Sequence, residues 1–155
     1  MLKRFTERAR QAVVLATEEA RARRHEVVGP EHLLMGLLRD ADGLGAQMLE
    51  RLQVSRESLR SEIERVLGEA PAGATTRDPR FSADLKAVFE ATVEEQWRHG
   101  HHWVGTEHLL LGLLGPRSTV SPMLRDAGAD LDAARGIAVQ LFADARQTLH
   151  AFRRV

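Results

Sequence analysis

The stretch Val28–Leu38, which reads Val-Gly-Pro-Glu-His-Leu-Leu-Met-Gly-Leu-Leu, decides the fold because it occurs twice. It returns at Val104–Leu114 as Val-Gly-Thr-Glu-His-Leu-Leu-Leu-Gly-Leu-Leu. Each copy opens as a helix start with a glutamate near the positive end of the helix dipole, and the first copy has Pro30 in the first turn, where helices accept proline. The leucines that follow predict a short helix with an apolar face. The chain therefore contains an internal repeat built around one apolar helix.

The repeat extends in both directions from this stretch. Residues 5–38 align with residues 81–114 at an offset of 76, with 13 of 34 positions identical. In the first copy the pattern predicts helices over residues 6–24, 30–38, 46–52 and 55–67, and no convincing strand. The sequence therefore predicts an all-α fold of two tandem four-helix repeats, about eight helices in all, packed as one compact domain with pseudo-two-fold symmetry. The expected boundaries are 1–67 for repeat 1, 68–80 for a linker, 81–142 for repeat 2 and 143–155 for a C-terminal helical tail.

Composition and charge exclude several classes of protein. The chain has 155 residues, no cysteine, and 22 basic residues against 22 acidic ones. The absence of cysteine excludes disulfides, thiol nucleophiles and thiolate metal sites. The charge balance argues against a nucleic-acid partner. No apolar run approaches the length of a membrane span, and the N-terminus lacks the apolar core of an export signal. We therefore expect a cytoplasmic protein with neither a nucleic-acid nor a membrane partner.

The repeated Gly-x-Glu-His-Leu-Leu motif, with Phe-Thr-Glu-Arg-Ala-Arg at residues 5–10, resembles the N-terminal domain of Clp-family AAA+ unfoldases of the ClpC and ClpA type. The sequence has no Gly-x-x-x-x-Gly-Lys-[Ser/Thr] loop, so this chain carries no ATPase module. The resemblance implies a non-catalytic protein- and peptide-binding module of the Clp protease system. Its expected partners are Clp protease components, adaptors or substrate proteins, and it would act as a stand-alone regulator or decoy. The alternative is an excised N-terminal domain that recruits substrates in cis.

The resemblance also implies two pockets for phosphoarginine on marked substrates. Their residues are two helix-start hydroxyls and two helix-start glutamates, namely Thr6, Ser82, Glu31 and Glu107. A helix start would bind the phosphate and a glutamate the guanidinium. The alternative is that these residues are ordinary helix caps. Two departures from the family pattern weaken the assignment: Pro30 replaces a threonine, and Asp84 replaces an arginine in the second repeat.

A further surface implied by the resemblance is a groove that binds cyclic-peptide antibiotics in actinobacterial relatives. The corresponding residues here are Leu2, Phe5, Phe81, Lys86 and Glu90. The two phenylalanines could instead be core residues. Cyclic peptides are therefore a second expected class of ligand.

The histidines leave one other class of function open. The cluster of His99, His101 and His102, with His108 nearby, contains ligands that metals prefer, and a metal-dependent enzyme is the remote alternative. Two of the four recur in repeat 1 at the same offset, which instead favours structural hydrogen bonds at helix ends. The sequence contains neither the Gly-x-Ser-x-Gly nor the His-Glu-x-x-His motif of hydrolases. We therefore expect no catalytic residue, no metal and no cofactor.

Overall fold

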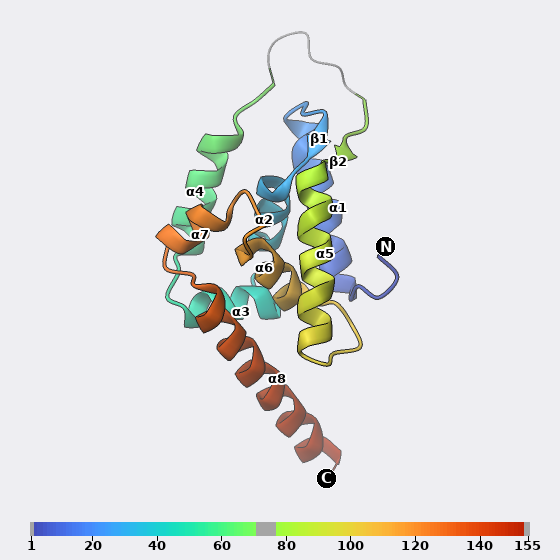
Figure 1. Ribbon diagram of the computed structural model, residues 1–155, viewed down its shortest axis with the longest axis vertical. Coiled ribbons are helices and arrows are strands. Elements are labelled where there is room, and N and C mark those ends of the chain that lie inside the picture. The colour runs from blue at the N-terminus through green and yellow to red at the C-terminus, as the bar shows by residue number, and fades with distance from the viewer. Residues whose placement is uncertain (1, 71–76, 154–155) are drawn as a thin grey trace.

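The computed structural model describes residues 2–70 and 77–153, with side chains placed as far as residue 145. This part of the chain contains eight helices and two very short strands (Figure 1). Repeat 1 comprises α1 (Glu7–Ala22), β1 (Val27–Val28), α2 (Pro30–Leu38), α3 (Leu44–Arg51) and α4 (Arg56–Leu67). Repeat 2 comprises β2 (Arg80–Phe81), α5 (Ala83–Arg98), α6 (Thr106–Leu114), α7 (Ser121–Asp126) and α8 (Leu131–Arg153). The predicted all-α class with about eight helices is confirmed.

The two long opening helices begin at hydroxyl caps. The side chain of Thr6 accepts a hydrogen bond from the Ala9 amide at 3.2 Å, and that of Ser82 accepts one from the Leu85 amide at 3.0 Å. Each cap satisfies one of the free amides of a first helical turn, which stabilises the helix by about 1 kcal/mol. The side chains of Thr6 and Ser82 therefore already have a structural role within their own helices.

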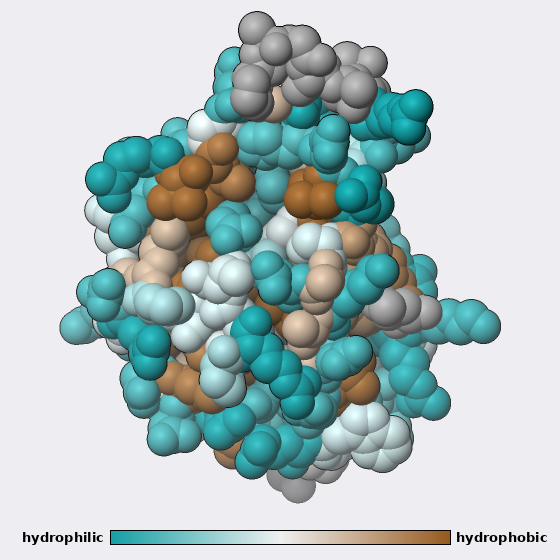
Figure 2. All heavy atoms as spheres, turned by 45° about the horizontal axis from the view of Figure 1, so that its top comes forward, coloured by the Kyte–Doolittle hydropathy of each residue, from teal (hydrophilic) through white to brown (hydrophobic). Residues whose placement is uncertain are grey.

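The core forms where each opening helix packs against the apolar helix that follows it. Gly36 of α2 allows α1 to approach closely, since a Cβ at this position would lie only 2.3 Å from the carbonyl oxygen of Ala12. All of α2 except Glu31, and all of α6, are buried, as their leucine runs predict. Figure 2 shows one face of the molecule, on which hydrophilic side chains surround several separate apolar patches.

The structure corrects the expectation that the chain has no strand. β1 and β2 form a two-stranded parallel ladder, with Val27 opposite Arg80 and Val28 opposite Phe81. A matching isolated bridge joins Phe5 to Val104. Two-residue strands are too short to show the alternation by which strands are recognised. These pairings hold the start of α5 against the start of α2, and the start of α1 against the start of α6.

The closing helices of the two repeats differ in length. α4 ends at Leu67, and its C-cap Gly68 has a φ of +53°, whereas α8 runs from Leu131 to Arg153. α8 therefore passes through position 143, where the helical tail was expected to begin, and extends away from the body of the domain (Figure 1). Arg80, at the end of the predicted linker, belongs to β2, and residues 71–76 lie outside the described part.

Candidate functional site

The residues predicted for the two pockets meet across the repeats, with the hydroxyl start of one copy beside the glutamate start of the other. The Thr6 amide donates to the Val104 carbonyl at 2.9 Å, which places the start of α1 beside the start of α6. A cavity of about 340 Å³ opens there, which we call the Glu107 pocket. Its lining residues are Thr6, Glu7, Arg8, Leu44, Gly105, Thr106 and Glu107. Thr6 of repeat 1 thus shares a pocket with Glu107 of repeat 2, and not with Glu31 of its own repeat.

Glu107 is an unusual carboxyl group because it is only 7% exposed. Burial raises its pKa to about 7, although the amides of Glu107 and His108 at the helix start act in the opposite direction. Its side chain folds back over Gly105, where a Cβ would lie 1.7 Å from Oε1. Arg8, the cation that lines the pocket, is paired with Asp40 at 2.7 Å. The pocket therefore holds a buried acid that a cationic ligand would convert to its ionised form.

At the pseudo-symmetric position Glu31 lies beside Ser82, and we call this position the Glu31 pocket after the pocket that the sequence predicts there. The Ser82 amide donates to the Val28 carbonyl at 3.0 Å. A Cβ on Gly29 would lie 2.8 Å from Glu31 Oε2 and 3.9 Å from Ser82 Oγ, so both side chains border the same glycine. Glu31 is only half-buried, and its Oε1 accepts a hydrogen bond from Thr119 at 2.8 Å. Its carboxylate is therefore already bound by a neighbouring side chain.

The two pockets also differ in charge. Arg8 lines the Glu107 pocket, whereas the residue at the corresponding offset beside the Glu31 pocket is the exposed Asp84. A second carboxylate near Ser82 repels a phosphate and attracts a cation. The threonine that replaces Pro30 in repeat 2 also has a structural role, because the Thr106 hydroxyl accepts a hydrogen bond from the Gly45 amide at 3.0 Å. Both departures from the family pattern, Pro30 and Asp84, are therefore at the Glu31 pocket, and neither is at the Glu107 pocket.

Four histidines form two equivalent hydrogen-bonded chains, which we call the histidine relays. In the second, the Gly105 amide donates to His108 Nδ1 at 2.9 Å, and His108 Nε2 lies 2.6 Å from His101 Nδ1. Since Nδ1 accepts, the proton of neutral His108 is on Nε2 and is donated to His101. Gly29, His32 and His25 repeat this arrangement in the first relay. The recurring histidines thus make the hydrogen bonds at helix starts that their repetition suggested.

Burial keeps both inner histidines of the relays neutral. It lowers the pKa of His32 to about 4 and that of His108 to about 3. His99 Nδ1 donates to the carbonyl oxygen of Glu95 at 2.8 Å, and His102 is exposed. Among the described residues, no three His, Asp or Glu side chains are placed to hold a metal ion.

The residues of the predicted groove lie at different depths. Lys86 and Glu90 are exposed on α5, and Leu2 and Phe81 are partly buried. Phe5 is only 2% exposed, which agrees with its alternative assignment as a core residue. It packs edge-to-face on Phe89 with ring centroids 6.0 Å apart, and Phe81 packs edge-to-face on the same ring at 5.5 Å. Phe5 is therefore a core residue, whereas the other four residues of the predicted groove reach the surface.

Two further residues belong to the same face of α5. Val93 and Trp97 follow Lys86 and Glu90 at intervals of three and four positions, so all four lie on one helical stripe. Trp97 is 75% exposed, and the sequence analysis did not select it. The spacing along the predicted helix was the signal that could have found it.

No helix in the described part of the chain is long and apolar enough to cross a membrane. The structure thus offers no spanning segment within residues 2–70 and 77–153.

Comparison with known proteins gives consistent matches. The model of the Clp repeat N-terminal domain matches residues 4–127. The negative regulator of genetic competence ClpC/MecB from Bacillus subtilis is 37% identical over 142 residues, which cover 91% of this chain and 17% of that protein. Chloroplastic ClpC3 from Oryza sativa is 35% identical over 140 residues, covering 90% of this chain and 15% of that protein. The chain thus spans less than a fifth of the length of these relatives.

Solved structures agree on the fold. The N-terminal domain of the chaperone ClpD from Arabidopsis thaliana superimposes with a TM-score of 0.66 at 27% identity, covering 92% of this chain and 99% of that one. A structure described as a complex of the ClpV N-domain with VipB peptide superimposes with a TM-score of 0.68 at 16% identity, covering 80% of this chain and 77% of that one. The duplicated motif, the paired helix starts and these matches lead to one conclusion: the chain belongs to the Clp repeat N-terminal domain family.

Proposed function

We propose that this chain is a non-catalytic cytoplasmic module that binds protein segments for a Clp-type protease system. Its partners would be substrates, adaptors or components of the protease. The observation that carries the proposal is the Glu107 pocket, in which a buried carboxyl group with a pKa of about 7 lies at the junction of two helix starts. A buried acid without a compensating cation destabilises a fold, so its presence in a cavity supports a ligand-binding role.

Phosphoarginine is the ligand whose charges suit this pocket. The start of α1 and Arg8 offer donors to the phosphate, and Glu107 offers an acceptor to the guanidinium. The Glu31 pocket suits this ligand less well, because Asp84 takes the place of Arg8 and Thr119 already donates to Glu31. We therefore propose unequal pockets, with the Glu107 pocket as the principal site.

The structure described as a complex of the ClpV N-domain with VipB peptide, which has a similar fold, supports a peptide-binding role. The same role would apply whether the module acts as a separate regulator or decoy or recruits substrates in cis for an unfoldase. The proposed site for cyclic peptides remains the surface of Leu2, Phe81, Lys86 and Glu90, with Phe5 buried in the adjoining core.

Calorimetric titration with phosphoarginine tests the proposal. Wild type is compared with Glu107→Gln and Glu31→Gln, with arginine and inorganic phosphate as control ligands. We expect Glu107→Gln to weaken phosphoarginine binding at least about tenfold, the cost of one charge-assisted hydrogen bond, and Glu31→Gln to weaken it less. Equal affinities in wild type and Glu107→Gln would show that this carboxyl group does not bind the ligand.

A further inference from the structure

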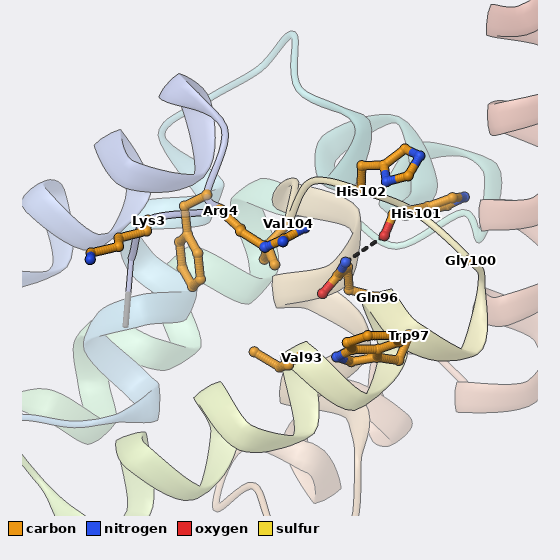
Figure 3. Close-up of a pocket in the computed structure, with 10 residues that line it drawn as sticks. Lys3, Arg4, Val93, Gln96, Trp97, Gly100, His101, His102 and Val104 are labelled. Atoms are coloured by element: carbon orange, nitrogen blue, oxygen red, sulfur yellow. Dashed lines mark hydrogen bonds between the residues drawn. The ribbon is translucent and has the colours of Figure 1, made fainter.

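A cavity of about 370 Å³ opens at the C-terminal end of α5, separate from the two paired pockets, and we call it the Trp97 cavity (Figure 3). It lies between the N-terminal segment, the last turns of α5 and the loop that leads to α6. Its lining residues are Lys3, Arg4, Phe5, Val93, Gln96, Trp97, Gly100, His101, His102 and Val104. Its volume falls within the range of small-ligand pockets, about 300–1,000 Å³.

The cavity combines a fixed apolar base with an exposed aromatic wall. Phe5 and Val104 are 2% and 1% exposed and are joined by the isolated bridge, so the base is part of the core. The side chain of Gln96 donates to the carbonyl of His101 and fixes the loop that forms one side. Trp97, at 75% exposure, leaves most of its ring in water. A large exposed aromatic ring over a preformed apolar cavity is typical of an anchor site for a partner side chain.

The corresponding place in repeat 1 has polar side chains and an exposed ion pair. The residue at the offset of 76 from Trp97 is Arg21, which pairs with Asp78 at 3.1 Å. Thr17 stands where repeat 2 has Val93. The fold therefore does not require a tryptophan here, and repeat 2 has the apolar side chains Val93 and Trp97 where repeat 1 has Thr17 and an ion pair.

The rim of the cavity is cationic. Lys3 and Arg4 are both exposed, and neither forms an ion pair with any residue that the structure describes. The exposed ring of His102 lies on the loop side (Figure 3). Glu90 is the nearest acidic residue along the α5 stripe, one turn before Val93 and outside the lining. Two free cations beside an apolar cavity attract a partner that carries carboxylates next to an apolar side chain.

We propose that the Trp97 cavity binds an acidic peptide segment, with one aliphatic or aromatic side chain inserted against Trp97 and flanking carboxylates paired with Lys3 and Arg4. The inference rests on the proposed function only in that the chain binds peptides. The site and the chemistry of its ligand are distinct from those of the Glu107 pocket.

The protein itself provides the probe for a test. Trp97 and Trp103 are its only tryptophans and it has no tyrosine, so Trp103→Phe leaves Trp97 as the sole strong fluorophore. The ligand is a short peptide in which aspartates and glutamates flank a single leucine. We expect its binding to shift the Trp97 emission to shorter wavelength and to weaken as salt screens the rim. Replacement of the leucine by serine should weaken binding at least about tenfold.

Calorimetry on variants then locates the site. Trp97→Arg introduces the residue that repeat 1 has at this position. This variant and Lys3→Glu/Arg4→Glu should each lower the affinity for the acidic peptide at least about tenfold. Trp103→Ala, the matched control, removes the other exposed tryptophan and should leave the affinity unchanged. Circular dichroism confirms that each variant is folded.

Three results would overturn the inference: unchanged affinity in Trp97→Arg, equal binding of a peptide with lysines in place of the acids, or equal binding of the serine peptide. If Glu107→Gln no longer bound the acidic peptide, that result would also overturn the inference, because the peptide would then bind in the Glu107 pocket. Phosphoarginine binding, measured on the same variants, tests the proposed function separately. It should persist in Trp97→Arg.

Discussion

Replacing Glu107 by glutamine should make the protein more stable and, at the same time, less able to bind its ligand. Glutamine keeps the shape of the protonated acid and cannot ionise. The pKa of Glu107 is raised from 4.5 to about 7, so the folded state holds this proton more tightly than the unfolded chain. Stability is therefore lost as the pH rises from about 4.5 to 7, and the loss is complete above pH 7.

The size of the effect follows from the pKa. Each unit by which the pKa of Glu107 differs between the folded and unfolded states corresponds to about 1.36 kcal/mol, so ionised Glu107 destabilises the fold by up to about 3 kcal/mol. Wild type and Glu107→Gln should have nearly equal stabilities at pH 4.5. At pH 8 the variant should be more stable by up to about 3 kcal/mol. Comparison at equal pH removes the contributions of all other titrating groups.

Urea denaturation followed by circular dichroism at several pH values between 4.5 and 8 measures this difference. Glu31→Gln is the matched control, because water reaches its half-buried carboxylate and Thr119 donates to it, and it should lack the gain at pH 8. A difference between Glu107→Gln and wild type that does not change with pH would refute the argument. So would a variant that is less stable than wild type at pH 8.

Three further predictions concern the scaffold, and urea denaturation measures each. Gly36→Ala should destabilise the protein by about 1–3 kcal/mol, because its Cβ meets the backbone of α1, whereas Gly136→Ala in the open part of α8 should stabilise it by about 1 kcal/mol; equal effects would contradict the packing argument. Arg135→Ala leaves the buried Glu95 without its bidentate partner and should cost about 3 kcal/mol, most of which Glu95→Gln/Arg135→Met should restore. Near pH 5.5, unfolding lets His32 and His108 take up about two protons in total, while Glu107 releases about one. The free energy of unfolding should therefore rise by about 1.4 kcal/mol per pH unit. His108→Gln removes one of the two histidines and should flatten this slope.

Much of the fold could be predicted from the sequence because it depends on local and periodic signals. The hydroxyl caps, the leucine runs and Gly68 placed most helices within a few residues of their positions in the structure. The repeat showed which residues are equivalent. It could not show which copy supplies the partner of each residue, because an alignment offset carries no information about contacts. The pairing of Thr6 with Glu107 depends on backbone hydrogen bonds between segments about a hundred residues apart, and these become visible only in three dimensions.

The candidate sites show the same division. Asp84 revealed the asymmetry of charge from sequence alone, but the burial of Glu107 and the hydrogen bond from Thr119 to Glu31 arise from packing between the repeats. Whether Phe5 faced a groove or the core could not be decided without Phe89, the ring that it shares with Phe81.

The crossed helix starts have a consequence for the ancestry of the fold. A single repeat contains one hydroxyl start and one glutamate start, but each is completed by the other copy, so an unfused repeat could assemble these pockets only with a second molecule. Joining the copies by a short linker replaces that encounter with an intramolecular one, at an effective concentration on the order of millimolar. Fusion also allows the two sites to differ in sequence, since a substitution in one copy no longer appears in both. Asp84 beside one pocket and Arg8 beside the other are the kind of divergence that fusion permits.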